Sequence, residues 1–211
     1  MSEKRKSQAN SSNQLDVIFL DIDGVLLPFG PDIDKENKNS SNGLFPESTM
    51  MAFGWILQNH PSIKIVLSST WRSQPRWVAE AEDFICEFCG MDRVLKKGVA
   101  DKGTDTCSKS LQERKKIHSN FKFYDTTNIN NHSERQWEIQ EWLQNANNSQ
   151  FHKIRSWVAL DDEELVGGQH NERFRTQFVG HVVKTNSQTG LTLDDAKYAI
   201  TVLNKQLMLQ K

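Results

Sequence analysis

The sequence has no excess of charge of either sign. Lys and Arg together number 26, and Asp and Glu 27, among 211 residues, so the formal net charge is −1. Proteins that hold nucleic acid or acidic membranes by bulk attraction carry surplus positive charge. The balance therefore excludes strong bulk binding to nucleic acid, although it leaves room for a local basic patch. A chain of this length suits one domain with a substantial core.

Long apolar runs are also missing. The most apolar stretch, residues 17–29, contains Asp21 and Asp23, which a membrane-spanning segment would not tolerate. Residues 1–13 are polar and lack the apolar centre of a secretory signal, so we predict a disordered leader there. These absences predict a cytoplasmic protein that does not contact membranes. Residues 4–6 (Lys-Arg-Lys) resemble a nuclear localisation signal, but a solvated tail explains three basic residues better.

Cysteine is scarce, with three residues in the chain, which argues against a secreted, disulfide-stapled domain. Cys86 and Cys89 form a C-x-x-C that could, with Cys107 and His118, make a zinc site. The surrounding apolar residues have helical spacing, which favours thiols packed on a helix over zinc ligands. Those apolar residues are Trp77, Val78, Ala81, Phe84, Ile85 and Phe88.

Strand-like and helix-like segments alternate along the chain. The apolar run 15–20 predicts a parallel strand buried on both faces, and residues 63–67, 156–160 and 181–184 predict further strands. Helices are predicted over 46–59 and 75–88, after Ser133, and from Thr192. Ser133 and Gln136 would form a capping box, while Asp194 and Asp195 suit the first turn of the last helix and are given no metal.

This alternation predicts a doubly wound α/β domain with a mainly parallel sheet over residues 14–211. Two polar segments interrupt it. Residues 31–43 are expected to form a loop or flap, and residues 98–132 a small cap or insert.

Chemically capable side chains follow three of the predicted strands. Asp21-x-Asp23 follows the first, Ser68-Ser69-Thr70 the second, and Asp161-Asp162 a late one. In doubly wound folds, ligands bind outside the carboxyl ends of the strands. We therefore predict that these residues share one site.

The residue types suit phosphoryl transfer. Asp21 could attack phosphorus, and Asp23 could protonate the leaving oxygen and later deprotonate water. Gly24 would let the chain turn close to the phosphate, and Ser68 or Ser69 would donate a hydrogen bond to it. Carboxylates are the ligands that Mg²⁺ prefers, which makes four residues candidates for its site: Asp21, Asp23, Asp161 and Asp162.

The motifs resemble those of the haloacid dehalogenase (HAD) superfamily. Residues 17–25 (VIFLDIDGV) resemble its first motif, Ser68 after Ile65-Val66-Leu67 its second, and Asp161-Asp162 its fourth. The resemblance implies a Rossmann-like core, Mg²⁺ and an aspartyl-phosphate intermediate. It also implies a cation from the third motif. Arg135 stands in the corresponding place, with Lys115, Lys116 and Lys122 as alternatives.

A closer resemblance is carried by Leu67-Ser68-Ser69-Thr70-Trp71-Arg72 and by residues 181–192, which contain HVVKTN and GLT. These segments are similar to the HAD domain of Swiss Army Knife RNA-repair proteins. That resemblance implies a small phosphorylated substrate or the phosphate end of a nucleotide or polynucleotide. Trp71 and Arg72 could line the substrate pocket. Equally, they could be a core indole and an arginine tied to a carboxylate.

Three other functions use similar residues. A receiver domain carries its acid pair after the first strand and its acceptor later, which is the reverse of the order here. A catalytically inactive HAD fold would not need Asp21, Asp23, Asp161 and Asp162 intact. A phosphotransferase or phosphomutase using the same intermediate stays open. The sequence favours a Mg²⁺-dependent phosphohydrolase.

Overall fold

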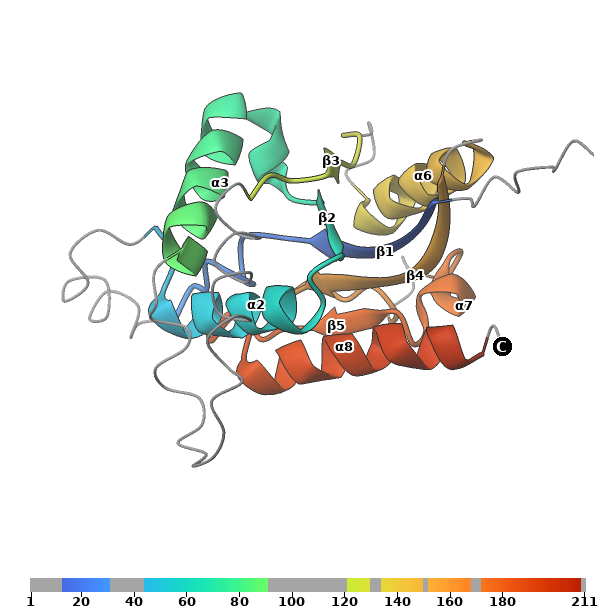
Figure 1. Cartoon of the computed structure of the whole chain (residues 1–211). Helices are drawn as coiled ribbons and strands as arrows, with labels where there is room; N and C mark the ends of the chain where they lie inside the picture. The colour runs from blue at the N-terminus through green and yellow to red at the C-terminus, as the bar shows by residue number, and fades with distance from the viewer. Residues whose placement is uncertain are drawn as a thin grey trace, which may run out of the picture.

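The computed structural model describes residues 13–30, 44–90, 121–129, 134–149, 152–167 and 172–209. Strands and helices alternate along these segments (Figure 1). Their order is β1 (Asn13–Leu20), α2 (Glu47–Asn59), β2 (Lys64–Leu67), the 3-10 helix η1 (Thr70–Ser73), α3 (Pro75–Gly90), β3 (Asp125–Thr126), α6 (Arg135–Asn148), β4 (His152–Asp161), α7 (Arg175–Phe178), β5 (Val182–Lys184) and α8 (Leu193–Met208).

Five parallel strands form one sheet in the order β3-β2-β1-β4-β5. In this sheet Leu20 of β1 lies opposite Leu67 of β2 and Leu160 of β4. Since all the strands run the same way, their carboxyl ends meet at one edge. The doubly wound α/β fold predicted from the sequence is thereby confirmed.

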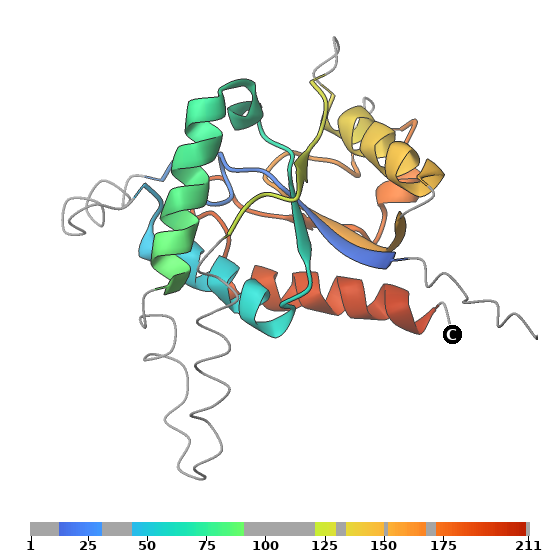
Figure 2. The same ribbon diagram turned by 45° about the horizontal axis from the view of Figure 1, so that its top comes forward.

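The central strands bury both faces. On one face Ile18, Leu20 and Leu67 join a core cluster with side chains of α2, α3 and α8. On the other, Val17 and Phe19 pack with α6, where Phe19 meets the ring of Trp142 edge to face at 5.3 Å. Figures 1 and 2 show α2 and α8 along one side of the sheet and α6 on the opposite side. Because both faces of β1 are buried, the residues at positions 15–20 are apolar except for Asp16.

Several element boundaries differ from the prediction. Strand β1 already includes Asn13, and β4 begins at His152 rather than near residue 156. Strand β3 was not predicted, and it places part of the supposed cap, residues 98–132, within the main sheet. Trp77, one of the apolar residues with helical spacing, is 46% exposed.

The predicted capping box at the start of α6 is wrong. The helix begins at Arg135, and its N-cap residue is Glu134, whose side chain makes no capping hydrogen bond. The amide of Gln136 instead donates to the carbonyl oxygen of Leu165. Helix α8 begins as predicted, with Thr192 at its N-cap and Asp194 and Asp195 in its first turn. Thr192 and Asp195 also form a reciprocal capping box.

Some predictions concern residues outside those described. These are residues 1–12 of the leader, the flap at 31–43, Ser133, Cys107, His118, and residues 98–120 and 130–132 of the supposed cap. Of the helices that the structure describes, none combines the length and apolarity needed to cross a bilayer.

Cys86 and Cys89 lie on α3 and are both partly buried. Burial raises the pKa of the Cys89 thiol to about 12, and Cys86 donates a hydrogen bond to the carbonyl oxygen of Phe121 at 3.3 Å. Among the described residues, both cysteines pack against the main core cluster.

Candidate active site

Three of the predicted site residues extend adjacent strands of the sheet. The amide of Asp21 donates to the carbonyl of Leu160, and that of Ser68 to the carbonyl of Leu20, at 3.0 and 2.8 Å. Asp161 ends β4 beside them. The residues Asp21, Ser68 and Asp161 are 5%, 1% and 1% exposed. The parallel register thus brings residues that are distant in the sequence to one buried point.

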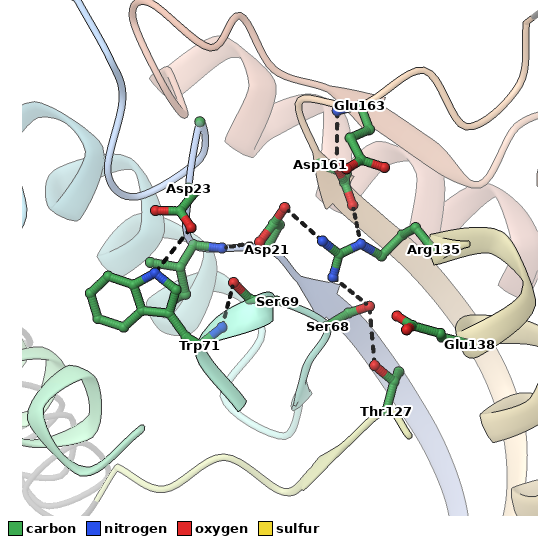
Figure 3. Close-up of polar contacts among 12 residues, drawn as sticks. Asp21, Asp23, Ser68, Ser69, Trp71, Thr127, Arg135, Glu138, Asp161 and Glu163 are labelled. Carbon is green, nitrogen blue, oxygen red and sulfur yellow. Dashed lines mark hydrogen bonds and ion pairs between the residues drawn. The ribbon is translucent and has the colours of Figure 1, made fainter. Parts of the chain in front are cut away.

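Arg135 reaches this point from the first turn of α6. Its guanidinium contacts Asp21 Oδ2 at 3.1 Å, Asp161 Oδ2 at 3.2 Å and Ser68 Oγ at 3.4 Å (Figure 3). Burial lowers the pKa of Arg135, but Asp161 and Asp21 outweigh burial and raise it. Arg135 is therefore the fixed positive charge of the site. Of the lysines considered as alternatives, Lys122 pairs with Glu82 at 2.6 Å, and Lys115 and Lys116 lie outside the described residues.

The two serines after β2 have different surroundings. Ser68 Oγ accepts hydrogen bonds from Arg135 and from the hydroxyl of Thr127, the latter at 3.4 Å. Ser69 Oγ accepts from the backbone N–H of Trp71 at 3.4 Å, and its hydrogen bond to Asp21 opposes the larger rise that burial causes in the pKa of that carboxyl. Both hydroxyls thus lie beside the carboxylate of Asp21 or its arginine partner.

Three carboxylates gather at the strand ends. Asp21, Asp161 and Asp162 each offer an oxygen within 4.8 Å of the others. Burial raises the pKa of Asp21, against the opposing charge of Arg135. Burial raises the pKa of Asp161 further, and the Asp21 charge adds to it. Three carboxyl groups thus face one guanidinium, and their hard oxygen donors suit Mg²⁺.

Asp23 lies apart from this carboxylate cluster, although the sequence made it a candidate metal ligand. Its Oδ2 accepts a hydrogen bond from the indole Nε1–H of Trp71 at 3.1 Å. Figure 3 shows Asp23 and Trp71 on one side of Asp21, with Arg135 and Asp161 on the other. The two ends of the site therefore carry different chemistry.

Gly24 has a left-handed backbone, with φ +70°. A Cβ at this position would overlap the carboxylate of Asp162. The hydroxyl of Thr185 donates to the carbonyl of Gly24 at 2.9 Å and fixes the turn to the end of β5. Glycine here thus admits Asp162, whereas the sequence suggested close approach of the phosphate.

Arg72 is tied to a carboxylate, which was one of its two predicted roles. Its guanidinium pairs with Glu138 and donates to the carbonyl of Ser69, and its side chain is 5% exposed. Glu138 lies one turn after Arg135 on α6. The ion pair therefore connects the loop after β2 to the helix that supplies Arg135.

Thr127, Glu138 and Thr185 were not predicted to belong to the site. Thr127 follows a two-residue strand, which is too short to show any periodicity. Glu138 could have been found from its spacing, because residues three apart share a helix face. Thr185 directly follows β5, in the position that Asp21 and Ser68 occupy after β1 and β2.

Comparison with known proteins agrees with this geometry. Residues 17–196 match the family described as the HAD domain in Swiss Army Knife RNA repair proteins, and the chain belongs to this family. No curated protein and no solved structure matches the chain. Membership supports a HAD-type hydrolase or phosphatase in general, and this superfamily typically uses a metal ion. The cluster of Asp21, Asp161 and Asp162 has the oxygen donors that such an ion requires.

Proposed function

We propose that this HAD-family protein is a Mg²⁺-dependent phosphomonoester hydrolase with Asp21 as its nucleophile. The observation that carries the proposal is the position of Arg135, whose guanidinium contacts Asp21, Asp161 and Ser68 together. A carboxylate that attacks a phosphate needs positive charge between the two anions. Arg135 supplies this positive charge beside Asp21, in a site that also contains the carboxyl groups of Asp161 and Asp162.

Each residue has a distinct role in the proposed reaction. A carboxylate oxygen of Asp21 bonds to phosphorus while the bond to the leaving oxygen breaks, and that oxygen takes its proton from Asp23. The phosphoryl group is then carried by Asp21. Water gives a proton to Asp23 and attacks phosphorus, which releases inorganic phosphate and restores the Asp21 carboxylate.

Arg135 and the serine hydroxyls would stabilise charge on the phosphoryl oxygens. Asp21, Asp161 and Asp162 would hold Mg²⁺, which supplies positive charge to the phosphoryl group when bound. Asp21 must be deprotonated to attack, and burial raises its pKa. The positive charges of Arg135 and Mg²⁺ would favour its ionised form. We propose a nucleotide or polynucleotide phosphate end as substrate, a choice supported by the description of the family.

The test is phosphate release from p-nitrophenyl phosphate with and without Mg²⁺. We expect EDTA to abolish release and Asp21→Asn to lower kcat at least about 1,000-fold. Beryllium fluoride, which mimics the aspartyl-phosphate, should bind the wild type only in the presence of Mg²⁺. An Asp21→Asn protein with wild-type activity would refute the nucleophile. Oligonucleotides phosphorylated at either end, compared with phosphorylated metabolites, would test the substrate class.

A further inference from the structure

Asp23 and Trp71 are 48 residues apart in the sequence, and the fold joins them by one side-chain hydrogen bond. We infer that Trp71 is a positioning residue that aims the carboxylate of Asp23 at the leaving oxygen. Its indole Nε1–H donates to Asp23 Oδ2 at 3.1 Å (Figure 3). The inference rests on the proposed function, since it assigns Asp23 the acid–base role.

The direction of the indole N–H is fixed from several sides. Trp71 lies in the single turn of η1, where its backbone N–H donates to Ser69 Oγ and its carbonyl accepts from Gln74. Its ring contacts Phe45 and Trp77, with both centroid distances at 5.9 Å. Phe45 is itself buried, so the ring of Trp71 rests against the core. A donor held in this way can restrict the side chain that accepts from it.

Asp23 needs such a restraint. Its backbone is set by the turn in which Gly24 donates to the carbonyl of Leu27 and Leu27 to that of Ile22, both at 2.8 Å. The side chain is half-buried and lies apart from the carboxylate cluster. Among the described residues, the indole of Trp71 is the hydrogen-bond donor to this carboxylate. It engages Oδ2 and leaves Oδ1 for the leaving oxygen.

A neutral donor also suits the chemistry of Asp23. In the proposed reaction Asp23 gives a proton to the leaving oxygen and takes one back from water. The indole N–H donates but cannot accept a proton, so it orients Asp23 without competing for the proton that Asp23 transfers.

The experiment compares two esters that depend differently on an acid. Phenoxide is a poor leaving group and needs its proton, whereas p-nitrophenoxide leaves readily as an anion. We expect Trp71→Phe to lower kcat/KM about 10- to 100-fold with phenyl phosphate and less than about 3-fold with p-nitrophenyl phosphate. Trp55→Phe is the matched control, because Trp55 of α2 is, like Trp71, partly buried against the same core cluster but does not bond Asp23. It should change either rate less than about 2-fold.

Asp23→Asn completes a double-mutant cycle. If Trp71 acts through Asp23, Trp71→Phe should slow the Asp23→Asn enzyme on phenyl phosphate by less than about 2-fold. Benzothienylalanine at position 71 keeps the ring shape without the N–H, and should reproduce the Trp71→Phe effect even if the Phe variant folds poorly. Equal losses on both esters, or additive losses in the cycle, would overturn the inference while leaving the proposed function intact. If wild type hydrolyses neither ester, the proposed function fails and the inference falls with it.

Discussion

At the scale of single residues, Arg135 has the most connected position in the site. It contacts side chains that follow β1 and β2 and one that ends β4. We expect Arg135→Ala to lower kcat about 100- to 1,000-fold, the usual loss when one charge-stabilising donor is removed. Steady-state phosphate release measures this. A wild-type rate would exclude Arg135 and return the role to a lysine.

Arg155 provides the matched control for that substitution. It also pairs with a buried aspartate of β1, Asp16, but does so several residues before the carboxyl end of the strand. Arg155→Ala should lower the melting temperature and leave kcat unchanged within about 2-fold, because it removes an ion pair that the reaction does not use. A large loss of kcat there would mean that Arg135→Ala reports general damage to β1.

Most of the residues that the sequence could identify are those whose place depends on the sheet, whereas Arg135 on α6 was expected only through the resemblance to the HAD superfamily. Asp21, Ser68 and Asp161 meet because parallel strands end at a common edge, and a buried strand is legible as an apolar run. Contacts between individual side chains could not be predicted in this way. The bond from Trp71 to Asp23 and the fit of Asp162 against Gly24 depend on the conformation of turns, which no periodicity encodes.

At the scale of elements, long periodic segments were predictable and short ones were not. Helices α2, α3 and α8 occur where they were predicted, and α8 has Asp194 and Asp195 in its first turn as expected. Strand β3 has two residues, too few for alternation, and is held by pairing with β2. The start of α6 was misplaced because its entry depends on contacts such as that of Gln136 with Leu165, which are remote in sequence.

The loop after β4 carries Asp162 and depends on Glu164. One carboxylate oxygen accepts from the backbone N–H groups of Val166 and Gly167 at 3.0 and 2.7 Å, and the other from Lys184 at 3.0 Å. The bond from Gly167, with help from Lys184 and Val166, lowers the pKa of Glu164 to about 2. Its stabilising effect is therefore full above the ordinary glutamate pKa and is lost as the pH falls toward 2.

Glu164→Gln should consequently loosen the loop that presents Asp162. We expect the Mg²⁺ concentration for half-maximal activity to rise about 10-fold, the lower end for residues that orient metal ligands, with kcat at saturating Mg²⁺ unchanged. Asp194→Asn is the control, because Asp194 is an exposed acid that also pairs with a lysine, Lys197, but lies on α8. An unchanged Mg²⁺ dependence in Glu164→Gln would show that Asp162 is placed without the loop's help.

At the scale of the whole molecule, two buried aspartates, Asp161 and Asp16, have opposite effects on folding stability when they are ionised. Burial raises the pKa of Asp161 well above its usual value, so ionising it in the folded protein costs stability. Burial also raises the pKa of Asp16, but hydrogen bonds from Arg155 and Ser156 and the charges of Arg155 and His60 bring it below normal. Ionised Asp16 therefore stabilises the fold.

These signs predict the pH dependence of the metal-free protein. The raised pKa values of Asp21 and Asp161 mean that the folded chain binds more protons than the unfolded chain. Their contribution to the unfolding free energy therefore falls as the pH rises through their pKa values in the folded protein. The contribution of Asp16 is present above about pH 4 and is lost as the pH falls through its lowered pKa. Bound Mg²⁺ would remove most of the pH dependence that comes from Asp21 and Asp161 and none of that from Asp16.

The same substitution, Asp to Asn, should therefore act in opposite directions at the two positions. Without metal, Asp161→Asn should melt at or above the wild-type temperature near neutral pH. Asp16→Asn should lose about 2 kcal/mol, or about 4–8 °C. Mg²⁺ at 100 times its dissociation constant should raise the melting temperature of wild type and Asp16→Asn by about 5–10 °C. It should leave Asp161→Asn nearly unchanged, because that variant lacks a carboxylate of the cluster. Thermal melts in EDTA and in Mg²⁺ measure all of these shifts, and a full Mg²⁺ response in Asp161→Asn would show that the ion binds elsewhere.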